Sequence, residues 1–201
     1  MTRKIVLASG NAGKVREINK LFSDYGINVI PQTEFDVPEA IEDGLSFVEN
    51  AIIKARNAAQ HSGLPAIADD SGIEVDALNH RPGIYSARYS GEGASDQTNN
   101  DRLLQELGDL EDNRRTARYR CVMVYMRDAD DPMPIIAEGT LEGRILHAPQ
   151  GKGGFGYDPL FWLEAQQCAA AELSLEDKNR ISHRAQASHQ LVNKLKQAGL
   201  I

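Results

Sequence analysis

Two adjacent carboxylates, Asp69 and Asp70, follow a short apolar run and precede Ser71 and Gly72. The run, residues 64–68, predicts a buried strand, and the Ser-Gly pair predicts a tight turn after it. Because side chains alternate along a strand, the two carboxylates should point to opposite faces. A carboxylate that faces a cleft needs a cation, either a basic side chain or a divalent metal. The alternative is a polar turn whose acids only cap backbone N–H groups.

A second group of polar residues follows the first apolar run, residues 4–8, which predicts a strand buried on both faces. The six residues after it are Ser9, Gly10, Asn11, Ala12, Gly13 and Lys14. Apolar residues then recur at helical spacing as far as Tyr25. Lys14 and backbone N–H groups would therefore lie at a helix N-terminus, where an anion binds readily. A Walker A loop is excluded, because the glycine spacing is too short and Val15 replaces the required Ser or Thr.

The next helix is predicted from about Ser46, which opens a capping-box pattern. One side of this helix is apolar, and Asn50, Lys54 and Asn57 share a polar face. We interpret this face as solvated at Asn57, whereas a functional role stays open for Lys54. The acidic turn before the helix, residues 39–44, fits a solvated loop.

The glycine-rich segment, residues 151–159, carries Phe155, Tyr157 and Asp158. It contains G-x-G-x-x-G, but Pro159 and strand-like residues follow it, so it is not a dinucleotide-binding fingerprint. A kinase loop is also excluded, since no H-R-D or D-F-G motif follows. Phe155 or Tyr157 could stack on a base, and Asp158 could accept a hydrogen bond from it. The alternative is a glycine hairpin with aromatic core residues.

Ser182, His183 and Arg184 begin the last predicted helix, with Ser182 as its N-cap. Two potentially cationic residues in a first turn oppose the helix dipole at a cost of about 0.3–1 kcal/mol. An anion or an electron-rich ligand would offset this cost, although an exposed pair without function is the alternative. His183 and His189 lack a nucleophile elbow such as G-x-S-x-G, which disfavours acyl transfer.

The composition predicts one globular domain, because 201 residues with 41% hydrophobic content can bury a sizeable core. A net charge of −7 disfavours duplex nucleic acid as a ligand. Cys121 and Cys168 lack metal-ligand spacing, and without a signal peptide they are expected to be free thiols in a reducing cytoplasm. No apolar run approaches the ~20 residues that cross a bilayer, so no membrane partner is expected.

The remaining periodicity predicts an α/β fold with a mixed sheet. Residues 117–126 are expected to form a central strand, and a polar turn at 128–134 leads into a return strand. Residues 138–145 should be strongly bent or bulged because of their glycines. Helices are predicted at about 97–107 and from 182 to the glycine stop at 199.

Together these residues indicate one kind of chemistry. Lys14, Lys54, Lys178 and Arg184 are separated cations that could hold phosphates, and the paired acids could hold a metal. Such a set suits a magnesium-dependent attack of water on a nucleotide phosphate, in which catalysis is mainly positioning and charge neutralisation.

The sequence resembles the inosine/xanthosine triphosphate pyrophosphatases, a family that converts non-standard purine nucleoside triphosphates to the monophosphate and pyrophosphate. The resemblance runs nearly end to end and is strongest to the bacterial members. It rests on motif blocks in the same order: residues 9–14, 49–51, 54–55, 68–72, 82–89, 153–159, Lys178 and 182–184. It implies an elongated two-lobed α/β fold with a central mixed sheet flanked by helices and the active site between the lobes. The lobes would interleave within one continuous domain, residues 1–201, and the protein would be a cytoplasmic homodimer.

The resemblance also implies a role for each motif residue. Asp70 would bind Mg²⁺ and act as the base, with Glu42, or alternatively Glu39, as second metal ligand and Lys54 neutralising phosphate charge. Ser71 would contact the nucleotide. The triphosphate would bind to Ser9, Gly10, Asn11, Ala12, Gly13 and Lys14. The base pocket would comprise Phe155, Gly156, Tyr157, Asp158, Lys178, His183 and Arg184. The substrates would be ITP, dITP, XTP and dXTP.

Hydrogen bonding explains how such a pocket would select its base. Hypoxanthine and xanthine carry a carbonyl at C6 where adenine carries an amine, so donors at that position reject adenine. Mismatched buried polar groups give discrimination of about 10⁴-fold. Two alternatives are a Maf-type pyrophosphatase, which acts on modified pyrimidine or methylated nucleotides, and a non-catalytic nucleotide-binding protein.

Overall fold

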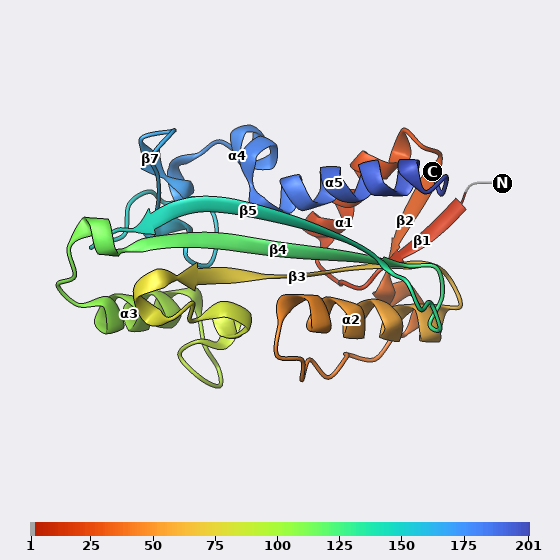
Figure 1. The fold of residues 1–201 in the computed structure, drawn as a ribbon, viewed down its shortest axis with the longest axis horizontal. Coiled ribbons are helices and arrows are strands. Elements are labelled where there is room, and N and C mark those ends of the chain that lie inside the picture. Colours follow the sequence, from red (N-terminus) through yellow and green to blue (C-terminus); the bar gives the residue numbers. More distant parts are fainter. Residues whose placement is uncertain (1–2) are drawn as a thin grey trace. The chain divides into compact units, whose positions relative to one another are not determined.

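A computed structural model describes residues 3–201, and every structural statement below refers to that part of the chain. Seven strands form one sheet in the order β2-β1-β3-β4-β5-β6-β7 (Figure 1). Their bounds are β1 Arg3–Leu7, β2 Ile27–Pro31, β3 Ala66–Val75, β4 Thr116–Met126, β5 Ile135–Ile145, β6 Phe161–Leu163 and β7 Cys168–Ala169. β1 pairs in parallel with β2 and β3, whereas β6 is antiparallel to β5 and β7. The predicted mixed sheet, with a central strand at β4, is confirmed.

Five α-helices accompany the sheet: α1 Ala12–Ser23, α2 Phe47–Ser62, α3 Asp96–Leu107, α4 Leu175–Ile181 and α5 His183–Gln197. Four of them lie where apolar periodicity predicts a helix. The short α4 is not predicted, because seven residues span too few turns to show a periodic pattern. None of the described helices is long and apolar enough to cross a membrane.

The described chain divides into two compact units. The first unit comprises the residues up to Asp70 together with 121–139 and 186–201, and the second comprises 71–120 and 140–185. The chain therefore passes from one unit to the other inside β3, β4, β5 and α5.

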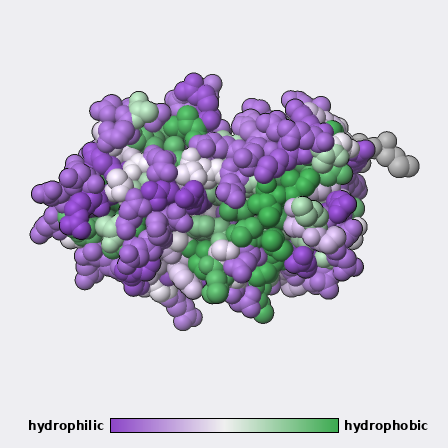
Figure 2. All heavy atoms as spheres, viewed as in Figure 1, coloured by the Kyte–Doolittle hydropathy of each residue, from purple (hydrophilic) through white to green (hydrophobic). Residues whose placement is uncertain are grey.

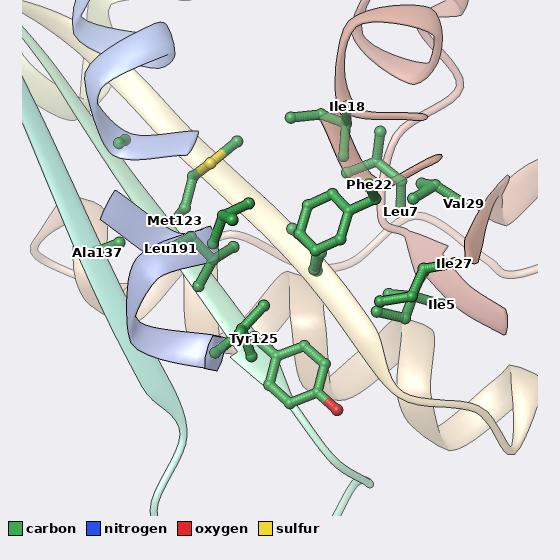
Figure 3. Close-up of a cluster of buried hydrophobic side chains, with 14 of the residues drawn as sticks. Ile5, Leu7, Ile18, Phe22, Ile27, Val29, Met123, Tyr125, Ala137 and Leu191 are labelled. Carbon is green, nitrogen blue, oxygen red and sulfur yellow. The ribbon is translucent and has the colours of Figure 1, made fainter. Parts of the chain in front are cut away.

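Alternating side chains of β4 build two cores in the first unit. Cys121, Met123 and Tyr125 pack in a cluster with α1 and α5, whereas Val122 and Val124 pack with α2. Figure 3 shows the first of these clusters, in which residues such as Ile18, Phe22 and Leu191 meet the sheet. Burying a side chain of this size contributes about 1.5–3 kcal/mol. Strands β1, β3 and β4 thus lie between α1 and α5 on one side and α2 on the other.

The second unit has its own core, which residues of α3, β4, β5 and β6 share. Ile73 and Val75 from the end of β3 are fully buried in it. Hydrophilic side chains cover much of the face shown in Figure 2, in line with a charged fraction of 25%. Among the described residues, Cys121 and Cys168 form no disulfide with each other.

Two local predictions differ from the structure. Ser71 and Gly72 form no tight turn, because β3 continues through them to Val75 and buries Ile73 and Val75 in the second core. The backbone N–H of Ile73 also donates to the Ser86 hydroxyl at 2.9 Å. Helix α1 ends at Ser23, so Tyr25 lies outside it and is 37% exposed. The strand predicted at 138–145 is confirmed as part of β5.

Candidate active site

Asp69 and Asp70 bind different lysines, as alternation along β3 predicts. Both carboxylate oxygens of Asp69 accept from Lys14 Nζ at 2.8 Å, and this lysine lies on α1. Asp70 Oδ1 accepts from Lys54 Nζ on α2 at 2.8 Å. The neighbours Ile67 and Ala68 divide in the same way between the two cores of the first unit. Each acid therefore lies on a separate side of the strand with a cation of its own.

Lys54 also faces a second carboxylate. Its Nζ lies 3.1 Å from Glu42 Oε2, so one ammonium meets both Glu42 and Asp70. Asn50 completes this set, since its side-chain amide lies 3.5 Å from Asp70 Oδ2. We name Glu42, Asn50, Lys54 and Asp70 the Asp70 group. Counting charged side chains, it carries one positive and two negative charges.

Burial and the surrounding charges shift both pKa values in the Asp70 group. Burial raises the pKa of the Asp70 carboxyl, and Glu42 adds to this, while Lys54 and Asn50 act against it. For Lys54, burial lowers the pKa, but attraction to Asp70, Glu42 and Asp69 outweighs it, so the net pKa is raised. Lys54 therefore stays charged, and Asp70 holds a proton more readily than an ordinary aspartate.

The acidic turn contributes Glu42 and not Glu39 to this group. Glu39 is exposed and lies within 4.0 Å of no basic side chain among the described residues. The turn is more than solvated, because Gly44 N donates to Asn50 Oδ1 at 2.9 Å. Just before the turn, the Asn57 amide donates to the Pro38 carbonyl at 2.7 Å. The solvated interpretation of Asn57 is therefore wrong. The cause is tertiary packing against α2, which local sequence does not reveal.

The N-terminus of α1 is capped by Asn11. Its Oδ1 accepts from Gly13 N at 2.8 Å and from Lys14 N at 3.1 Å, and Ser9 Oγ accepts from Asn11 N at 3.1 Å. Two of the N–H groups predicted to receive an anion are thus already satisfied by the cap. An anion at this helix end would have to exchange with the Asn11 side chain or use the neighbouring groups.

In the second unit, Asp158 is a buried carboxylate with three donors. Its Oδ2 accepts from Phe155 N at 2.8 Å and from Lys178 Nζ, and its Oδ1 accepts from Tyr119 OH at 3.3 Å. Gly154 has a φ of +77°, and a Cβ there would overlap the Asp158 carboxylate. Glycine is therefore required at this position for close approach of the loop. Burial raises the pKa of Tyr119 well above its usual value, so its hydroxyl stays protonated.

The two aromatic candidates in the glycine-rich segment differ. Phe155 is 61% exposed, and Lys178 Nζ lies 4.4 Å from its ring centroid. Tyr157 is only 4% exposed, and its hydroxyl donates to the Ser86 carbonyl at 2.8 Å. The side chain of Tyr157 is thus a core residue, and Phe155 is the ring presented for stacking. Gly156 is held to α3, because its N–H donates to Asp96 Oδ2 at 2.6 Å.

His183 and Arg184 lie at the start of α5, where Ser182 caps the helix as predicted. Ser182 Oγ accepts from Ala185 N at 3.1 Å. The His183 ring stacks on Tyr119 with centroids 4.8 Å apart and planes at 9°. Arg184 NH2 donates to Ser71 Oγ at 3.3 Å. We name Tyr119, Asp158, Lys178 and His183 the Asp158 group.

Comparison with known proteins assigns this arrangement to a family. The model of the Ham1 family matches residues 5–194. The chain belongs to the Ham1 family. A dITP/XTP pyrophosphatase of Thioalkalivibrio sulfidiphilus (strain HL-EbGR7) is 62% identical over 192 residues, which cover 96% of this chain and 98% of the relative. A dITP/XTP pyrophosphatase of Vibrio cholerae serotype O1 (strain ATCC 39315 / El Tor Inaba N16961) is 59% identical over 94% of both chains.

A solved structure supports the same assignment. A HAM1 protein from Coxiella burnetii superposes with a TM-score of 0.93 at 49% identity, covering 97% of this chain and 99% of that one. The resemblance to bacterial pyrophosphatases of this kind, inferred from the motif blocks, is therefore confirmed. The Maf-type alternative finds no support in these relatives.

Two residues of this Ham1 protein were missed as parts of the site. Asn50 is 1% exposed and bridges the acidic turn to Asp70, since its Oδ1 also accepts from Gly44 N at 2.9 Å. Its place on the same helix face as Lys54 was the available signal. No comparable signal pointed to Tyr119, because an aromatic residue in an alternating strand is typical of a core.

A cavity of about 550 Å³ lies in the second unit, and none of the predicted site residues lines it. Arg81 and Arg102 line it, and both face Glu106, at 3.1 and 2.9 Å. The single carboxylate of Glu106 therefore compensates only part of their charge. The chemistry described above lies in the Asp70 and Asp158 groups, and we assign no function to this cavity.

Proposed function

We propose that this Ham1 protein hydrolyses non-standard purine nucleoside triphosphates, ITP, dITP, XTP and dXTP, to the monophosphate and pyrophosphate. Water attacks the α-phosphorus, the bond from that phosphorus to the bridging oxygen breaks, and pyrophosphate leaves. The reaction would remove deaminated purines from the nucleotide pool. The observation that carries the proposal is the Asp70 group, an ammonium between two carboxylates, in a chain 62% identical to a dITP/XTP pyrophosphatase.

The Asp70 group fits a divalent cation. Glu42 and Asp70 both lie beside Lys54 and offer hard oxygen ligands to a metal. Their two negative charges exceed the single positive charge of the lysine. Mg²⁺ is usually held by one or two carboxylates together with substrate phosphates and water. The described residues include no group of three or more His, Cys, Asp or Glu side chains that could hold a metal ion. Bound there, Mg²⁺ would neutralise phosphate charge and polarise the phosphoryl group.

The protein's own groups would do the remaining work. Asp70 would take the proton of the attacking water, a role for which burial prepares it by raising its pKa. Lys54 stays protonated and would neutralise phosphate charge. Ser9, Gly10, Asn11, Ala12, Gly13 and Lys14 would bind the triphosphate, with the phosphate competing with Asp69 for Lys14.

The second unit would recognise the base. Lys178, His183 and Arg184 are donors, and the exposed Phe155 ring offers a stacking surface. Asp158 would orient Lys178, and Gly156 would bring the backbone close to the base. The side chain of Tyr157 would support this loop from the core, and Ser71 would contact the nucleotide beside Arg184. Donors at the C6 carbonyl would reject adenine, while exclusion of guanine would depend on its 2-amino group.

Further parts of the proposal concern the setting of the enzyme. We propose that it is cytoplasmic, in line with the absence of a disulfide between its described cysteines, and that it acts as a homodimer. Size-exclusion chromatography with light scattering would test the dimer, and a mass of one chain would contradict it.

The deciding experiment measures pyrophosphate release from dITP and dGTP side by side, with Mg²⁺ and with a chelator. We expect strong release from dITP that requires the metal, and little from dGTP. Equal release from both nucleotides would contradict the assigned selectivity. Absence of release from dITP and XTP with Mg²⁺ would overturn the proposed function.

A further inference from the structure

Glu42 lies in an irregular part of the chain. Residues 36–46, between the 3₁₀ turn Gln32–Phe35 and α2, contain no helix or strand. Asp70, by contrast, lies within β3 and is fixed by its strand. Two like charges that face one lysine repel each other, and a flexible segment would let Glu42 move away. Some feature of the fold must therefore hold residues 36–46 in place.

The polar face of α2 provides that hold. Asn50, Lys54 and Asn57 recur at positions i, i+4 and i+7, and each contacts the segment once. Asn50 Oδ1 accepts from Gly44 N at 2.9 Å, Lys54 Nζ pairs with Glu42 at 3.1 Å, and Asn57 Nδ2 donates to Pro38 O at 2.7 Å. The segment thus runs antiparallel to the helix, with one amide contact on each side of Glu42.

The close approach at one end demands a glycine. A Cβ at Gly44 would lie 2.7 Å from Asn50 Oδ1 and 2.7 Å from Glu49 Cβ. Glu49 fastens the next residue as well, because its carboxylate accepts from Leu45 N at 2.9 Å. Asn50 is itself buried at 1% exposure, so its amide has a fixed orientation towards both Gly44 and Asp70.

We propose that Asn50 and Asn57 are positioning residues that clamp the acidic segment to α2 on both sides of Glu42. The clamp brings the Glu42 carboxylate to Lys54 and Asp70, so that both acids can hold one divalent cation. The catalytic meaning of this inference rests on the proposed function. The clamp itself is tested by the affinity of the protein for a divalent cation, which requires no turnover. Among the described residues, the Asn57 side chain donates to Pro38 and makes no hydrogen bond to Asp70 or Lys54, so it would act through the segment.

The test compares Asn57→Ala with Gln60→Ala, a matched loss of an amide. Gln60 is an exposed residue of α2 whose side chain makes no hydrogen bond to any described residue. Mn²⁺ binding to the nucleotide-free protein is measured by electron paramagnetic resonance. We expect Asn57→Ala to bind Mn²⁺ about tenfold more weakly, the range seen when a ligand loses its supporting hydrogen bond. Gln60→Ala should bind Mn²⁺ as the wild type does.

Activity gives a second readout that a general loss of stability would not produce. With dITP saturating, Asn57→Ala should need about tenfold more Mg²⁺ for half-maximal rate, while kcat at high Mg²⁺ recovers to near the wild-type value. Asn50→Ala should show a larger effect, because it also removes the contact to Asp70. Since Asn50 is buried, its variant is interpreted only if thermal unfolding remains cooperative. If it does not, the test depends on Asn57→Ala alone.

The outcomes separate the clamp from the proposed function. Wild-type affinity for Mn²⁺ in Asn57→Ala, or a kcat that high Mg²⁺ does not restore, would overturn the clamp. So would a wild-type protein that binds no Mn²⁺. A wild type that binds Mn²⁺ but releases no pyrophosphate would instead contradict the proposed function, and the Mn²⁺ comparison would still decide on the clamp.

Discussion

The Asp70 and Asp158 groups each place a lysine on a carboxylate, yet they are built differently. Asp158 is 4% exposed and accepts from three donors, Lys178, Phe155 N and Tyr119 OH. Asp70 is 13% exposed and shares its lysine with Glu42. In the Asp158 group, three donors surround one carboxylate. In the Asp70 group, two carboxylates share one lysine.

This difference fits the two roles that we propose, binding for one group and reaction for the other. A buried carboxylate with several donors is fixed in position, which suits a group that orients a recognition side chain. A carboxylate with too few donors keeps a raised pKa and an affinity for added cations, which suits a proton acceptor beside a metal. Under the proposed function, aspartate would therefore serve two purposes, and its neighbouring side chains would decide which.

The strongest way to test this contrast is Asp70→Asn. We expect pyrophosphate release from dITP to fall by about 10²–10⁴-fold, because the variant cannot accept a proton from water. Folding and nucleotide binding should be largely spared, since burial already favours the uncharged form of this side chain. Pyrophosphate release and calorimetric nucleotide titration measure the two effects. Asp130→Asn, at an exposed position, should behave as the wild type.

An Asp70→Asn protein with a near wild-type kcat would remove Asp70 from the role of base. A protein that lost nucleotide binding as well would place Asp70 among groups needed to bind the substrate, and the contrast with Asp158 would weaken.

Asp158→Ala should lower the stability of the fold, which Asp70→Asn should largely spare. Removing one partner of a buried pair leaves Lys178 and the Tyr119 hydroxyl unsatisfied, and we expect a loss of about 3 kcal/mol in the free energy of unfolding. Urea unfolding followed by circular dichroism measures this. The control is Glu176→Ala, an exposed change on α4, the short helix that carries Lys178. Its free energy of unfolding should stay within about 0.5 kcal/mol of the wild-type value. A stability loss no larger than that of Asp70→Asn would break the comparison.

The sequence predicted most reliably those parts of the site that lie on regular elements. Ser46 and Ser182 cap α2 and α5, and alternation along β3 separates Asp69 from Asp70. Caps and alternation depend on neighbours in sequence, so a local pattern reveals them.

Tertiary contacts explain what the sequence did not reveal. The Ser-Gly pair at 71–72 favours a turn, but burial of Ile73 and Val75 keeps β3 extended. The choice of Glu42 over Glu39 depends on how an irregular segment packs on α2, and no periodicity encodes that. The core position of Tyr157 depends in the same way on a distant carbonyl, that of Ser86.

Arg184→Ala sharpens the comparison on the recognition side. We expect the preference for ITP over ATP, expressed as a ratio of kcat/KM values, to fall by about tenfold or more, because a donor to the C6 carbonyl is lost. The kcat for ITP should fall less than in Asp70→Asn. Steady-state kinetics with both nucleotides decides this, and an unchanged ratio would remove Arg184 from the base pocket.

The smallest expected effect concerns pH and a third carboxylate, Asp131, in the loop between β4 and β5. Like Asp158 it is rich in donors: Arg127 donates to it from the side chain and the backbone, and Met133 N donates at 3.0 Å. The hydrogen bonds from Arg127 hold the pKa of Asp131 well below its usual value. Because the folded pKa lies below the unfolded value of about 3.9, Asp131 contributes stability above that pH. This contribution is lost as the pH falls through the folded pKa.

Asp131→Asn removes this titration. Below about pH 4 its free energy of unfolding should therefore decline less steeply than that of the wild type, by a slope equivalent to at most one proton. Asp70, whose pKa is shifted upwards, cannot produce a loss of this sign, since protonation of Asp70 favours the folded state. Urea unfolding at a series of pH values gives both slopes. Identical slopes would show that the hydrogen bonds from Arg127 do not stabilise the charged form of Asp131, and the contrast with the raised pKa of Asp70 would lose its support.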